Sequence, residues 1–107
     1  MRIPTIYKIV SPSGKMYVGQ TVWPTVRMNK HKCLTESASS CRILSNAIAK
    51  HGWGAMKVEI LRGGPDAVGG AVREEDLDAL EMAFIKQFNC LEPNGYNIQE
   101  GGKVAWR

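Results

Sequence analysis

Two short strand-like segments joined by a tight polar loop constrain the fold of this chain more than any other feature. Residues 4–10 and 15–20 are rich in the apolar and aromatic side chains that favour strands. The residues between them include Pro12 and Gly14, which favour a turn. We therefore predict an antiparallel hairpin, which would bring the side chains of Tyr7 and Tyr17 close together.

A helix is expected directly after the hairpin, over residues 24 to about 34. Pro24 suits the first turn of a helix because proline has no N–H to donate there. Arg27 and His31 are four residues apart, so a helix would point both side chains the same way. Lys30 and Lys32 make the same segment strongly basic.

Three further elements complete the predicted fold. They are a helix that Ser39 or Ser40 caps and Gly52 ends, a strand over 56–61, and a helix that begins at the acidic residues 74–76. The glycine-rich residues 63–70 are expected to form a mobile surface loop. The sequence thus predicts one α+β domain over residues 1–107, with a small three-stranded antiparallel sheet flanked by about three helices.

Charge is unevenly distributed along the chain. Residues 1–57 contain nine Lys/Arg and one acid, a net charge of +8, whereas residues 58–107 contain five Lys/Arg and nine acids, a net charge of −4. A basic half favours a polyanionic partner such as nucleic acid, although charge of this kind also serves solubility.

Other features of the sequence exclude several classes of protein. Cys33, Cys41 and Cys90 are odd in number and have no CxxC spacing, so neither a zinc site nor a disulfide framework is indicated. No apolar run approaches the length of a membrane span, and the first residues lack a secretory signal. A cytoplasmic protein is the default expectation.

One acidic residue stands out in the last predicted helix. Glu81 lies four residues after Leu77 and four before Ile85, within the apolar stripe of that helix. A buried carboxylate is costly unless it is protonated, paired or bound to a metal. Glu81 is therefore either a metal ligand or a residue at the edge of the stripe that pairs with a Lys or Arg.

The order and spacing of several motifs resemble the GIY-YIG nuclease family, particularly its phage- and virus-type branch with homing endonucleases. The resemblance covers nearly the whole chain and rests on Ile6-Tyr7, Tyr17-Val18-Gly19-Gln20-Thr21, Arg27, His31, Leu44-Ser45-Asn46-Ala47-Ile48, Lys50-His51-Gly52-Trp53, Leu80-Glu81, Gly95-Tyr96-Asn97-Ile98 and Gly101-Gly102. The chain departs from the family at Thr5, where a glycine is usual, and at Val18, which replaces an isoleucine. A second histidine found in some members is absent from residues 39–41.

The resemblance implies that the chain hydrolyses phosphodiester bonds in DNA with the help of Mg²⁺. Glu81 would hold this ion, for which Mn²⁺ could substitute. Arg27 would grip the phosphate oxygens, and Tyr7 would be the general base, with His31 or Lys32 drawing its proton away. His31 is the alternative base. Tyr17 would contact the phosphate or the attacking water, and Asn97 would brace the site through its amide unless it only forms a local turn.

The predicted partner is DNA, and the resemblance implies a homing-type or free-standing viral nuclease, placed in the cytoplasm or nucleus of a host cell. Because the catalytic fold uses nearly all of the 107 residues and leaves no extra recognition elements, we expect low intrinsic sequence specificity. Plausible contacts to the DNA backbone are Lys8, Lys15, Lys30 and Arg42. Related homing enzymes carry a DNA-binding region after the catalytic domain, which we expect to be missing from this chain. The alternatives are a non-cleaving nucleic-acid-binding module on the same fold, and a restriction or repair nuclease.

Overall fold

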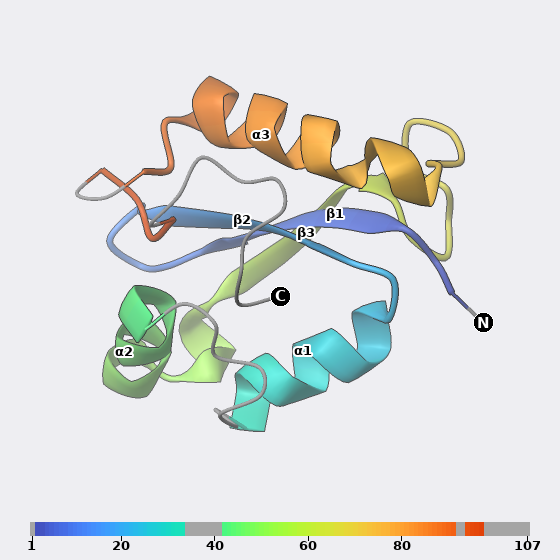
Figure 1. Ribbon diagram of the computed structural model, residues 1–107. Coiled ribbons are helices and arrows are strands. Elements are labelled where there is room, and N and C mark those ends of the chain that lie inside the picture. The colour runs from blue at the N-terminus through green and yellow to red at the C-terminus, as the bar shows by residue number, and fades with distance from the viewer. Residues whose placement is uncertain (1, 34–41, 92–93, 98–107) are drawn as a thin grey trace.

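The computed structural model describes residues 2–33, 42–91 and 94–97 (Figure 1). The strands are β1 (Thr5–Val10), β2 (Met16–Thr21) and β3 (Lys57–Gly63), and the α-helices are α1 (Pro24–Cys33), α2 (Arg42–His51) and α3 (Leu77–Phe88). Short 3-10 turns, η1 (Trp53–Ala55) and η2 (Glu74–Asp76), precede β3 and α3. In this part of the chain β1 is the central strand and pairs antiparallel with both neighbours, which confirms the predicted α+β fold.

The sheet separates two layers of helix, with α3 on one face and α1 and α2 on the other (Figure 1). Successive residues of a strand point to opposite faces. Tyr7 and Tyr17 accordingly belong to a core cluster with Leu44 of α2, whereas Val18 packs in a second cluster with Ile85 of α3. Both cores are therefore built from the same strands, and β2 contributes to each.

Strand β3 differs from the predicted range of 56–61 at both ends. It begins one residue later and extends to Gly63, and its pairing with β1 is irregular between Ile6 and Tyr7, where β3 has one extra residue. Gly63 and Val68 then exchange two backbone hydrogen bonds of 2.8 Å, and Gly63 is buried. The expected surface loop thus starts as a tight turn against the sheet, while Gly69 and Gly70 are exposed.

The last helix also begins later than predicted. The acidic residues 74–76 form the separate turn η2, and α3 starts at Leu77.

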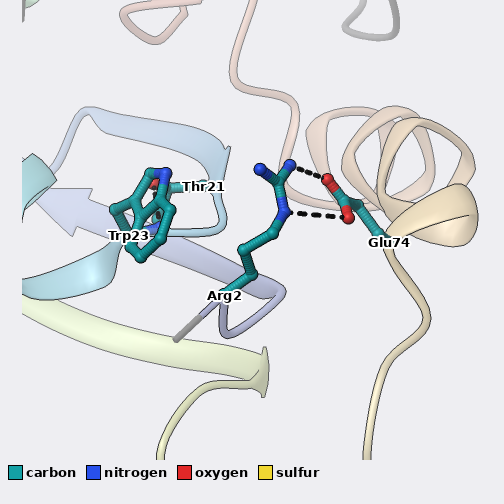
Figure 2. A network of polar contacts seen from close by, with 4 residues as sticks. All are labelled: Arg2, Thr21, Trp23 and Glu74. Carbon is teal, nitrogen blue, oxygen red and sulfur yellow. Dashed lines mark hydrogen bonds and ion pairs between the residues drawn. The ribbon is translucent and has the colours of Figure 1, made fainter.

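Arg2 forms an ion pair with Glu74 and lies over the ring of Trp23, 5.9 Å from its centroid (Figure 2). The hydrogen bond from Arg2 lowers the pKa of the Glu74 carboxyl. Arg2, which precedes β1, therefore contacts both η2 and the residue before α1. The predicted cap at Ser39 or Ser40 lies outside the described residues.

Within the described ranges, every helix is too short or too polar to cross a membrane.

Candidate active site

The two tyrosines lie together on the face of the hairpin that α1 and α2 cover. Antiparallel pairing sets Tyr7 opposite Gly19 and Ile9 opposite Tyr17, so the tyrosines are diagonal neighbours. Their ring centroids are 6.3 Å apart with the planes tilted by 48°, which confirms the predicted proximity. Tyr7 is 0% exposed and Tyr17 is 6% exposed.

Gly19 makes this arrangement possible. A Cβ atom at position 19 would lie 2.6 Å from the hydroxyl oxygen of Tyr7 and 2.9 Å from a ring carbon of Tyr17. Such distances are too short for any side chain, so the Tyr7 phenol occupies the space that a residue other than glycine would fill. The phenols therefore approach the backbone of β2, which is an edge strand of the sheet.

Asn97 covers part of the outer edge of β2. Its side-chain Oδ1 accepts a hydrogen bond of 2.9 Å from the N–H of Val18, and its Nδ2 donates one of 2.9 Å to the Val18 carbonyl. The Tyr96 N–H donates to the Met16 carbonyl at 2.9 Å. The Asn97 amide thus pairs with β2 as a neighbouring strand would, directly beside Gly19, rather than closing a local turn on its own backbone.

Glu81 lies on the opposite side of the sheet from the tyrosines, on the face of α3 that contacts β2. It is 7% exposed, as the apolar stripe predicted. The side chain of Gln20 donates a hydrogen bond of 3.1 Å from Nε2 to Glu81 Oε1 and another of 2.7 Å to Asp78 Oδ1. The tyrosine pair therefore contacts β2 at Gly19, and the Glu81 carboxylate contacts it at the next residue, Gln20, from the opposite face.

Arg27, His31 and Lys32 all lie in α1, which covers the tyrosine face of the sheet (Figure 1). The helical backbone places Arg27 and His31 about one turn apart in α1. The positions of these three side chains lie outside what the structure describes.

The residues predicted to contact the DNA backbone are placed differently from one another. Lys15 is exposed in the loop before β2. Lys8 is largely buried: its ammonium is 3.2 Å from Glu59 Oε1 and 4.7 Å from the centroid of the Phe88 ring. The Lys8 ammonium therefore already has partners within the fold. Lys30 and Arg42 lie in α1 and α2, and their side chains are outside the described part.

The oxygen atoms beside Gln20 suit a hard divalent cation. Carboxylate and amide oxygens are the ligands that Mg²⁺ takes from proteins, and it keeps several waters besides. Among the described residues no three His, Cys, Asp or Glu side chains gather into one cluster. Glu81, with Asp78 nearby, could supply one or two carboxylates to such an ion, whose remaining ligands would be water and phosphate.

Sequence reasoning missed Gln20 and Asp78 as members of this site. Asp78 precedes Glu81 by three residues, so the helical period alone places both carboxylates on one face. Gln20 alternates with Gly19 along β2 and must therefore face away from the tyrosines. The signal for both residues was present, but only the packing of α3 over β2 brings them together.

The fold and the site together define an α+β domain with a tyrosine pair and a buried carboxylate on either side of one edge strand. A solved structure with this fold is a Glu-to-Ala mutant of the catalytic domain of intron endonuclease I-TevI, a GIY-YIG nuclease. It is 25% identical to this chain, covers 95% of this chain and 99% of its own, and superposes with a TM-score of 0.73. Scanning against protein-family profiles gave no match, and a search of curated proteins gave none either.

Proposed function

We propose that this chain is a metal-dependent DNA endonuclease domain that hydrolyses phosphodiester bonds. The observation that carries the proposal is the likeness to a nuclease catalytic domain over 95% of the chain. That likeness supports a nuclease function in general. The finer features, namely the metal, the DNA substrate and a homing-type or viral role, rest on the motifs and on the chemistry of the residues at β2.

Glu81 is the residue that would hold the metal, which we propose to be Mg²⁺, with Mn²⁺ as a substitute. When bound there, the ion supplies Lewis-acid stabilisation of the phosphate and the leaving oxygen. A carboxylate that is only 7% exposed and already hydrogen-bonded has little freedom to rotate. It would therefore present its charge in one orientation, at little entropic cost on binding.

Arg27 would bind the non-bridging phosphate oxygens, because its guanidinium is always charged and presents several donors in one plane. The attacking water also needs a general base, for which Tyr7 and His31 are the candidates. The complete burial of Tyr7 limits its contact with bulk water and favours His31. Tyr17 would then orient the phosphate or the water, while Asn97 keeps β2 in place beside them.

Replacing single residues tests this assignment directly. We expect Glu81→Gln and Arg27→Ala each to lower the rate at which supercoiled plasmid is nicked in Mg²⁺ by about 100-fold or more, since each removes several kcal/mol of transition-state stabilisation. Glu75→Gln and Arg73→Ala are matched controls, because both residues are exposed and pair with each other before α3 begins. Their nicking rates should equal that of the wild type.

Two results would contradict the proposal in different ways. Nicking that persists in EDTA, or in both Glu81→Gln and Arg27→Ala, would exclude the metal-dependent mechanism. DNA binding without cutting by the wild type, in Mg²⁺ and in Mn²⁺, would instead identify a binding module on a nuclease fold. His31→Ala and Tyr7→Phe distinguish the two candidate bases, because only loss of the true base removes the rise of the rate with pH.

A further inference from the structure

The side-chain amide of Gln20 occupies an unusual position for a residue on an edge strand. It reaches from β2 to α3 and donates to two carboxylates at once, to Asp78 at 2.7 Å and to Glu81 at 3.1 Å. An amide nitrogen has two hydrogens, so these two bonds use its full donor capacity. The amide is thereby held between the two acids.

Like charges one helical turn apart repel each other, and the Gln20 amide is a donor that contacts both Asp78 and Glu81. A lysine at position 20 would neutralise one of them. A neutral amide instead donates to both carboxylates and adds no positive charge of its own beside them.

We propose that Gln20 is a positioning residue for the metal centre: Asp78 orients the Gln20 amide, and the amide orients the Glu81 carboxylate that would bind the ion. This inference rests on the proposed function, because it concerns the same metal. It assigns roles to two residues that do not themselves need to touch the ion. Groups that orient a metal ligand in this way typically change metal affinity by about 10- to 100-fold when they are removed.

The test measures metal binding separately from catalysis. Gln20→Met keeps an unbranched side chain of similar length but removes both donors. We expect it to weaken the binding of Mn²⁺, measured by titration calorimetry or by the EPR signal of the free ion, by about tenfold or more. Gln87→Met is the matched control, since Gln87 is exposed on the same helix as Glu81, and it should bind Mn²⁺ like the wild type.

Two variants of Asp78 separate positioning from a general loss of structure. Asp78→Asn keeps an oxygen that can accept from the Gln20 amide, whereas Asp78→Ala keeps none. We expect Asp78→Asn to retain more of the Mn²⁺ affinity than Asp78→Ala. High Mg²⁺ should restore the nicking rate of Gln20→Met, because the catalytic groups are intact, but should not restore that of Glu81→Ala.

Wild-type Mn²⁺ affinity in Gln20→Met would overturn the inference, as would equal losses in the two Asp78 variants. In either case the proposed nuclease function would stand if the wild type binds Mn²⁺ through Glu81 and cuts DNA. A wild-type protein that neither binds Mn²⁺ nor cuts would overturn both. Thermal unfolding of each variant shows whether a loss of binding reflects a loss of fold.

Discussion

At the scale of single residues, Gly19 has no room for a side chain, because the two tyrosines of the site fill the space beside it. Its backbone lies against the phenols of Tyr7 and Tyr17, and the adjacent Gln20 projects to the other face. Glycine is needed here because of the space that the phenols fill, and not because of an unusual backbone conformation, since Gly19 is not among the glycines with positive φ.

Gly19→Ala is therefore expected to destabilise the fold by about 1–3 kcal/mol, because the added methyl group forces the tyrosine rings to move. Urea unfolding followed by tryptophan fluorescence measures the change. Gly54→Ala is the matched control, because a Cβ at position 54 meets no atom within 4 Å, and it should change the stability by less than about 0.5 kcal/mol. Equal stabilities of the two variants would show that the tyrosine pair adapts without cost.

At the scale of elements, β2 organises the site because it is an edge strand with a core on each face. Its outer edge is covered at Met16 and Val18 by Tyr96 and Asn97, which come from the far end of the described chain. The edge is thus closed beside the tyrosines, next to the residues that carry the proposed chemistry. An exposed strand edge is otherwise a place where chains associate.

Asn97→Ala should therefore destabilise the protein by about 1–3 kcal/mol, since it leaves the N–H and C=O of the buried Val18 without their partner. It should also lower nicking, because β2 carries Gly19 and Gln20. Urea unfolding and the plasmid assay measure the two effects. Asn94→Ala, at an exposed turn position, should leave both unchanged. If the Asn97 and Asn94 variants behave alike, the edge contact is not needed.

At the scale of the whole molecule, the basic half of the sequence contributes β1, β2, α1 and α2, and the acidic half contributes α3 and all of β3 but its first residue. The sheet therefore lies between a basic layer and an acidic helix, with the tyrosines on the basic side and Glu81 on the acidic side. A phosphate that binds at the edge of β2 would meet cationic groups from one layer and a metal held by the other.

The salt dependence of DNA binding tests this division. The affinity for a short duplex, measured by fluorescence anisotropy over a range of NaCl concentrations, should fall steeply as salt rises because counterions are released on binding. Lys15→Gln should reduce the slope of log K against log salt by about 1. Lys86→Gln, on the exposed face of α3, should leave it unchanged. A slope that changes equally in both variants would place DNA against α3 as well as against the hairpin loop.

The sequence alone determined most of the fold and the kinds of residue at the site. Turn residues between two strand-like runs predicted the hairpin that brings Tyr7 and Tyr17 together, and helical spacing placed Glu81 in a buried stripe, because both signals follow from local backbone geometry. Both bounds of β3 and the first residue of α3 were less well predicted. There the pairing of Gly63 with Val68 and the separate turn at 74–76 depend on neighbours that local sequence does not specify.

Only the tertiary structure decided how those residues combine. The packing of α3 over β2 brings Gln20 within hydrogen-bonding distance of Asp78 and Glu81, and the return of the chain to the edge of β2 gives Asn97 its partner. The tertiary structure also pairs Lys8 with Glu59 and places its ammonium over the Phe88 ring, whereas the sequence alone had suggested Lys8 as a contact to DNA. These contacts join residues some 50 to 80 positions apart, so the arrangement of the elements in space, and no local pattern, determines them.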